Sequence, residues 1–243
     1  MLSSLKAGVR SVGPLYRVIN RARGSRIHEP SRSLPGAARI GSDYGGWVVD
    51  LQQMSAESVV YAVGVGEDIT FDLGLIAAIG CNVHAFDPTP GAVKWVERQS
   101  VPAQFHFHPV GLGSEDGEAV FQIPPVDGNH SYSLTADPSA EVRGTVNCEI
   151  RRLGTIMQEL GHDRIDLLKM DIEGFEYSVI DDIIDVGIRP QQLLIEFHHN
   201  MYTHGRGETD RAVAMLKTAG YDLFWVSDVG HEYAFIFGGP TAR

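Results

Sequence analysis

The chain has 243 residues, 43% of them hydrophobic and 21% charged, which is enough for one α/β domain with a buried core. Its formal net charge is −11, and eight of its 20 basic residues lie in residues 1–40, so the remainder is strongly acidic. An acidic body repels phosphates, which argues against a nucleic-acid partner, and two cysteines are too few for a disulfide framework or a zinc motif.

The N-terminal part is basic and differs in composition from the rest. Residues 1–21 place apolar residues at roughly helical spacing between arginines, which predicts a helix. Three interpretations stay open for it: packing on the domain or a partner, contact with a membrane surface, or a targeting segment. No apolar run approaches the roughly 20 residues of a membrane span, so we expect a cytoplasmic protein, with peripheral membrane contact through the basic N-terminus as an option.

Residues 22–43 are rich in glycine and proline and predict a linker. The expected domain organisation is therefore a basic N-terminal helix and linker over 1–43, followed by one folded domain over 44–243.

From residue 58 onward, short apolar runs alternate with amphipathic stretches. In chain order the first predicted elements are a strand at 58–63, a helix at 69–79, a strand at 82–86, a helix at 90–99 and a strand at 105–107. An alternating run at 118–123 follows a turn signal, so it predicts a hairpin excursion. Residues 124–144 predict an irregular loop.

The second half continues the alternation. The predicted elements are a strand at 148–152, a helix at 153–160, a strand at 165–170, a helix at 175–184, a strand at 192–197, a helix at 206–219, and strands at 221–226 and 232–237. Strands that are apolar on both faces predict a mostly parallel sheet covered by helices on both sides. The last two strands predict a C-terminal hairpin that adds one antiparallel strand.

The residues that follow the first two strands carry the first functional signal, because open α/β sheets bind ligands at the carboxyl ends of their strands. Gly64 and Gly66 let the backbone approach a ligand closely, and Asp68 is suited to capping the next helix. Ile69 stands where a dinucleotide loop has its third glycine. Asp87, after the second strand, predicts hydrogen bonds to ribose hydroxyls. Together these residues favour a nucleoside ligand, without separating a nicotinamide cofactor from S-adenosylmethionine.

A carboxylate cluster follows the strand at 165–170. Asp171, Glu173 and Glu176 lie within six residues, and three such acids repel one another unless a cation lies among them. A sulfonium, an amino group or a metal ion would qualify. The alternative is that the acids cap the helix that begins there.

This block, Lys169-Met-Asp-Ile-Glu-Gly-Phe-Glu176, resembles the signature of the FkbM-type S-adenosylmethionine-dependent methyltransferases. Segments 63–66, 86–90, 112–121, 131–134 and 193–198 resemble further family blocks in the same order, so the similarity runs from about residue 57 to 200. Three positions depart from the family pattern. Ala62 stands where an acid is usual, Asp68 where a glycine is usual, and Gly154 where Asp is frequent.

The resemblance implies a Rossmann-like class I methyltransferase fold, with S-adenosylmethionine as cofactor and O-methylation of a small-molecule or glycan acceptor. It also implies cofactor-binding roles for residues at the strand ends. Gly64 and Gly66 would line the methionine part, Asp87 the ribose, and Asp171 the methyl or amino group. The weaker candidates for cofactor contact are Glu67, Asp68, Tyr44 and His108.

The acceptor side is predicted from the end of the strand at 192–197. Alternation places Glu196 and His198 on one face and His199 on the other. Three roles stay open for these residues. In the first, a histidine is the base and the catalytic groups are His198, Glu196, His199 and Asp171. In the second, Mg²⁺ or another divalent ion is bound by Asp171, Glu196 and His198; in the third, the residues only form hydrogen bonds. Two rival classes also stay open, a nicotinamide-dependent oxidoreductase and a non-catalytic module with this fold.

Overall fold

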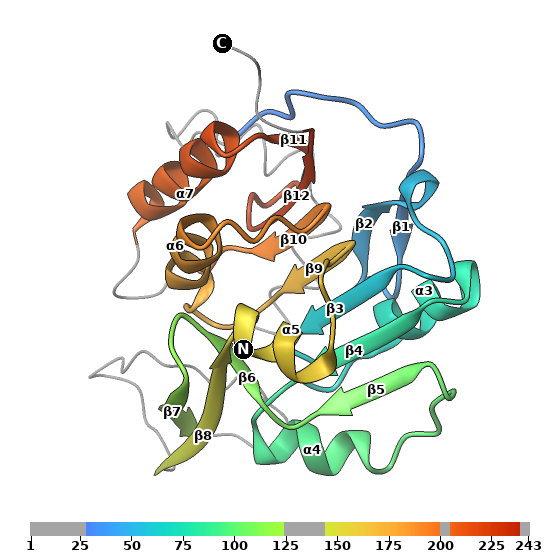
Figure 1. Cartoon of the computed structure of the whole chain (residues 1–243), viewed down its shortest axis with the longest axis vertical. Coiled ribbons are helices and arrows are strands. Elements are labelled where there is room, and N and C mark those ends of the chain that lie inside the picture. Colours follow the sequence, from blue (N-terminus) through green and yellow to red (C-terminus); the bar gives the residue numbers. More distant parts are fainter. Residues whose placement is uncertain (1–27, 124–143, 200–204, 239–243) are drawn as a thin grey trace.

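The computed structural model describes residues 28–123, 144–199 and 205–238 (Figure 1). A central sheet has the strand order β11-β12-β10-β9-β3-β4-β5. Its strands are β3 (Val59–Val63), β4 (Asn82–Phe86), β5 (Phe105–His108), β9 (Leu167–Met170), β10 (Gln192–Glu196), β11 (Tyr221–Val226) and β12 (Glu232–Phe237). The predicted helix within residues 1–21 and most of the predicted loop at 124–144 lie outside the described residues.

The sheet is parallel apart from β12. This strand lies between β10 and β11 and pairs antiparallel with both. The predicted C-terminal hairpin with its single antiparallel strand is therefore confirmed. The α/β class and the mostly parallel sheet are confirmed with it.

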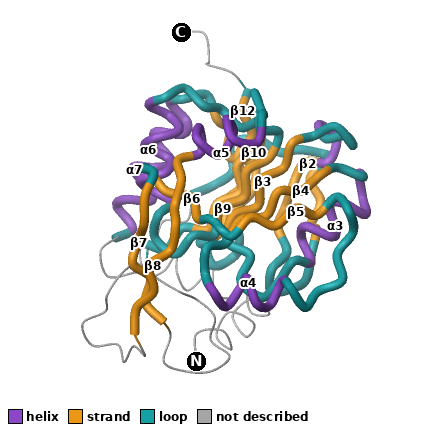
Figure 2. The backbone as a smooth tube through the Cα atoms, turned by 60° about the horizontal axis from the view of Figure 1, so that its bottom comes forward, coloured by secondary structure: helices purple, strands orange, loops and turns teal. Residues whose placement is uncertain are grey.

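Helices cover both faces of this sheet (Figure 2). They are α3 (Thr70–Ile79), α4 (Pro90–Val96), α5 (Leu153–Leu160), α6 (Glu176–Asp185) and α7 (Arg206–Thr218). Side chains of α5, α6 and α7 form one apolar core with the sheet, while side chains of α3 and α4 form a second core on the other face. Alternate residues of β3 divide between the two cores, as Tyr61 and Ala62 do, so the central strands are buried on both sides.

The predicted linker at 22–43 is wrong at residues 37–40, which form a strand. β1 (Ala37–Ile40) pairs antiparallel with β2 (Trp47–Asp50), which a short 3₁₀ helix (Leu51–Gln53) follows. The backbone N–H of Ser31 also donates to the carbonyl of Leu223, at 2.8 Å. β1 is four residues long and only half-buried, so its sequence carries too little alternation to separate it from a loop.

A second small sheet has the order β6-β8-β7, formed by β6 (Gly111–Gly113), β7 (Gly117–Ile123) and β8 (Gly144–Arg152). The expected excursion at 118–123 is therefore a long hairpin (Figure 2) whose second strand begins at Gly144, four residues before the predicted start. The ring of Phe121 on β7 packs against Phe175, with centroids 5.8 Å apart. This contact brings the hairpin to the loop that precedes α6.

Among the helices that the structure describes, none combines the length and apolarity needed to cross a lipid bilayer.

Candidate active site

The glycine loop after β3 lies directly against the end of β9. Gly64 has φ +85°, and a Cβ placed there would lie 1.8 Å from the backbone oxygen of Asp171. Gly66 also has a positive φ, +55°, but a Cβ there would meet nothing within 4 Å. Gly64 is therefore required by close backbone packing, whereas Gly66 faces open space at the carboxyl edge of the sheet.

Asp87 is buried and organises this loop. One carboxylate oxygen accepts hydrogen bonds from the N–H groups of Val65 (3.0 Å) and Gly66 (2.9 Å). The other accepts from the N–H (2.9 Å) and hydroxyl (2.6 Å) of Thr89. Gly66 and Asp87 therefore meet, as expected. Four internal donors occupy the carboxylate, so a ribose would have to exchange with some of them.

Lys169 and Asp72 are two buried ionisable residues that the sequence did not single out as site residues. Lys169 lies opposite Ala62 in the β3–β9 register, and its amino group donates to the carbonyl of Gly64 at 2.5 Å. Asp72, on α3, is buried; desolvation raises its pKa to about 7, although the positive charge of Lys169 acts in the opposite direction. Lys169 therefore holds the glycine loop through the carbonyl of Gly64, a contact that the sequence pattern could not indicate.

The turn before β2 contacts the same loop. The hydroxyl of Ser42 donates to Asp68 at 2.7 Å, and the N–H of Gly45 donates to that hydroxyl at 2.8 Å. Tyr44, on this turn, is 48% exposed, and Glu67 is exposed as well. The structure therefore brings three of the four weaker cofactor candidates, Tyr44, Glu67 and Asp68, to the same turn and loop.

Asp68 is not the N-cap of α3, because Ile69 holds that position. The Asp68 carboxylate nevertheless accepts from the N–H of Thr70 at 2.8 Å. Burial acts to raise the pKa of Asp68, but hydrogen bonds from Ser42 and Thr70 bring the net shift downward.

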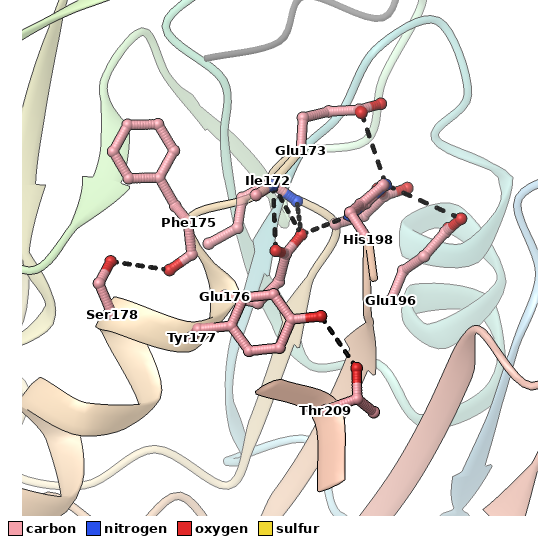
Figure 3. Close-up of polar contacts among 11 residues, drawn as sticks. Ile172, Glu173, Phe175, Glu176, Tyr177, Ser178, Glu196, His198 and Thr209 are labelled. Carbon is pink, nitrogen blue, oxygen red and sulfur yellow. Dashed lines mark hydrogen bonds and ion pairs between the residues drawn. The ribbon is translucent and has the colours of Figure 1, made fainter. Parts of the chain in front are cut away.

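The acceptor-side residues form a cluster around the His198 imidazole (Figure 3). Its Nε2 lies 3.6 Å from Asp171 Oδ1, 3.5 Å from Glu173 Oε2 and 3.9 Å from Glu196 Oε1. Its Nδ1 lies 2.6 Å from Glu176 Oε1. The predicted convergence of Asp171, Glu196 and His198 is therefore present.

The loop Ile172–Phe175 explains this geometry. Glu173 has φ +53°, an uncommon conformation for a residue with a side chain, and its carboxylate points toward His198. The fully buried Glu176 accepts hydrogen bonds from the N–H groups of Gly174 (3.0 Å) and Ile172 (3.3 Å). Glu176 is therefore more than a helix-capping residue, because it connects this loop to the imidazole.

The carboxylates also act on the pKa of the ring. Burial acts to lower the pKa of His198, but the charges of Glu176, Glu173 and Glu196 raise it well above the usual value. The surrounding carboxylates therefore favour the protonated form of the imidazole.

His199 and His108 lie in different surroundings. His199 packs edge-on against His231, with centroids 4.8 Å apart, and its pKa falls to about 3 because of burial and nearby positive charge. The structure does not bring it into the carboxylate cluster. His108 stacks on Phe86 (4.8 Å), and its Nε2 lies 3.0 Å from His84 Nδ1, so its predicted approach to the cofactor stays a prediction.

The strand order, the glycine loop and the acids at two neighbouring strand ends define a Rossmann-like fold of the class I methyltransferase type. Comparison with known proteins agrees with this. The chain belongs to the methyltransferase FkbM domain family, whose model matches residues 59–223. The resemblance inferred from the motifs is thus confirmed.

Individual relatives are more distant. The chain is 30% identical over 141 residues to the Homo sapiens protein called "Probable methyltransferase-like protein 24", a match that covers 57% of this chain and 32% of that protein. It is 22% identical over 141 residues to the hexuronic acid methyltransferase AglP of Haloferax volcanii, covering 54% of this chain and 56% of that protein. The chain therefore spans about a third of the length of its methyltransferase-like protein 24 relative.

Among solved structures, the FkbM methyltransferase of Methylobacillus flagellatus KT aligns with a TM-score of 0.48 and 14% identity. The alignment covers 76% of this chain and 44% of that one.

Proposed function

We propose that this protein uses S-adenosylmethionine to methylate a hydroxyl oxygen of a sugar-like acceptor. The observation that carries the proposal is the convergence of three strand ends: Gly64 contacts the backbone of Asp171, and Asp87 holds the N–H of Gly66. A nucleoside cofactor with a cationic group suits this edge, since glycines admit close approach and acids stand beside them.

The acceptor class rests on the chemistry of the His198 cluster and on one relative. The cluster offers many carboxylate oxygens, which suit hydroxyl groups, and the name of the Haloferax volcanii relative states that it methylates a hexuronic acid. The strongly acidic body argues against a nucleic-acid acceptor. A carbohydrate or related polyhydroxylated product is therefore the proposed acceptor.

In the proposed reaction the acceptor oxygen bonds to the methyl carbon as the carbon–sulfur bond breaks. S-adenosylhomocysteine leaves with that electron pair, and the hydroxyl proton passes to a base. His198 is the candidate base, and the carboxylates around it favour the protonated imidazole that this step would produce. The alternative role for Asp171, Glu196 and His198 is to bind Mg²⁺ or another divalent cation.

Calorimetric titration with S-adenosylhomocysteine tests the cofactor. We expect binding, and we expect Asp87→Ala to weaken it at least tenfold, because the variant loses both the proposed ribose contact and the bonds that shape the glycine loop. Glu57→Ala is the matched control: Glu57 is exposed and precedes β3 at the opposite end of that strand, so its variant should bind like the wild type.

Thermal melts of both variants separate loss of binding from loss of folding. Binding of NAD⁺ together with no binding of S-adenosylmethionine or S-adenosylhomocysteine would refute the proposal and favour an oxidoreductase. Tight S-adenosylhomocysteine binding that Asp87→Ala leaves unchanged would refute the role of Asp87.

A further inference from the structure

The Nε2 atom of His198 is a buried nitrogen without a hydrogen-bond partner in the described part of the chain. The side chain is 10% exposed, and this nitrogen points at three carboxylate oxygens that lie 3.5–3.9 Å away. Hydrogen bonds between nitrogen and oxygen require about 2.7–3.2 Å. The imidazole is thus surrounded by acceptors that are too distant for it to reach.

These spacings suit a cation between the groups. Ligand atoms of Asp171, Glu196 and His198 all lie within 4.8 Å of one another. An ion with bonds of about 2.1 Å holds its ligand atoms roughly 3–3.5 Å apart, so modest inward movement of these side chains would complete a site. A central cation would also offset the mutual repulsion of the carboxylates.

Glu176 supplies the supporting interaction that histidine ligands of metals commonly have. Its carboxylate lies 2.6 Å from His198 Nδ1 and is itself held by the N–H groups of the Ile172–Phe175 loop. A carboxylate at Nδ1 fixes the ring orientation and directs Nε2 toward the ion. Glu176 faces Nδ1, whereas the other three carboxylates face Nε2.

We propose that Asp171, Glu196 and His198 bind one divalent transition-metal ion of the Mn²⁺ type, with Glu176 as the positioning residue of His198. An imidazole ligand distinguishes such ions from Mg²⁺, which prefers oxygen ligands and an octahedral shell of waters. Two carboxylates offset the charge of the ion. Glu173, at 3.5 Å from Nε2, lies on the rim of the same site.

The inference rests on the proposed function for its chemical role. The metal site adjoins the glycine loop, because the backbone of Asp171 contacts Gly64. An acceptor hydroxyl bound to such an ion loses its proton more readily.

Titration of the full chain with Mn²⁺, followed by the loss of the free-ion signal in electron paramagnetic resonance, tests the site without any assay of activity. We expect one bound ion per chain and weaker binding of Mg²⁺ by at least tenfold in competition. His198→Gln should abolish binding, and Glu176→Gln should weaken it by about 10–100-fold. Glu97→Gln, which changes an exposed acid at the end of α4, is the control and should bind normally.

Equal affinity of the wild type, His198→Gln and Glu176→Gln would overturn the proposal, as would binding of Mg²⁺ as tight as that of Mn²⁺. Asp171→Asn serves as a second ligand variant if a melt shows that Glu176→Gln does not fold. Failure of this inference remains distinguishable from failure of the proposed function. Binding of S-adenosylhomocysteine without binding of Mn²⁺ would contradict only the metal site. Binding of Mn²⁺ without binding of S-adenosylhomocysteine would contradict only the proposed function.

Discussion

At the scale of single residues, two glycines of one loop have different physical reasons to be glycine. Both have positive φ, but only Gly64 packs its Cα against a neighbouring backbone, that of Asp171. The sequence shows the two glycines as equivalent members of a motif. Their separation into a packing position and an open position depends on where β9 ends.

Gly64→Ala should therefore lower the free energy of unfolding by about 2 kcal/mol or more in excess of the loss that Gly66→Ala causes. Both variants carry the left-handed backbone strain of about 1–2 kcal/mol, but only the first must also displace the Asp171 carbonyl. Urea unfolding of the two variants measures the difference. Equal free energies of unfolding would show that the loop moves away from β9 at little cost.

At the scale of secondary-structure elements, β4, β5 and the turn after α5 share a group of histidines. His84 stacks with His106 (5.0 Å) and His108 (5.3 Å) and meets His162 edge-on (4.9 Å). The ring nitrogen of His162 also lies 2.7 Å from the hydroxyl of Tyr61 on β3. Burial, followed by the neighbouring imidazoles His108, His162 and His106, lowers the pKa of His84 to about 4.

This group should make the sheet edge sensitive to acid. A histidine whose folded pKa lies below its unfolded value of 6.5 contributes stability above pH 6.5, and this contribution is lost as the pH falls toward 4. We expect the melting temperature of the wild type to fall more steeply over that interval than that of His84→Phe, which keeps a ring but cannot titrate. The difference between the melting temperatures of the two proteins at pH 8 is the reference. If the two melting temperatures fall in parallel from pH 8 to pH 4, His84 is not the source of the acid sensitivity.

At the scale of the whole molecule, the β1–β2 sheet is joined to the central sheet by a buried side-chain amide. Gln192, at the start of β10, accepts a hydrogen bond from the N–H of Asp50 (2.9 Å) and donates to the carbonyl of Asp50 (3.0 Å). Both residues are buried, with Gln192 at 0% exposure. This pair connects the segment before β3, which carries the turn at Tyr44, to the sheet that carries the carboxylates.

Gln192→Leu should cost about 2–4 kcal/mol, because it leaves the N–H and carbonyl of Asp50 buried without partners. Gln53→Leu is the control at the same junction: Gln53 is exposed, and its variant should change the free energy of unfolding by no more than about 0.5 kcal/mol. Chemical denaturation checks both values. A Gln192 variant as stable as the control would mean that the two sheets are held together by apolar contacts alone.

The sequence could predict the parallel sheet, its covering helices and the terminal hairpin, because double-sided apolar strands and amphipathic helices repeat over most of the chain. It could also predict that Asp87, Asp171, Glu196 and His198 share one sheet edge, since residues that follow parallel strands lie at the same end. It could not predict β1, which is four residues long, or β6, which is three, because runs so short carry no usable period.

The sequence by itself determined which residues stand at the ends of the strands, and therefore the chemical character of the edge: glycines, carboxylates and one histidine. Only the tertiary structure decided how they are used. Asp87 is occupied by four internal donors, Lys169 holds the carbonyl of Gly64, and Glu176 faces His198 rather than solvent. The reason is physical: periodicity fixes which face a side chain occupies, whereas hydrogen bonds and charge pairs depend on distances between segments that are remote in the chain.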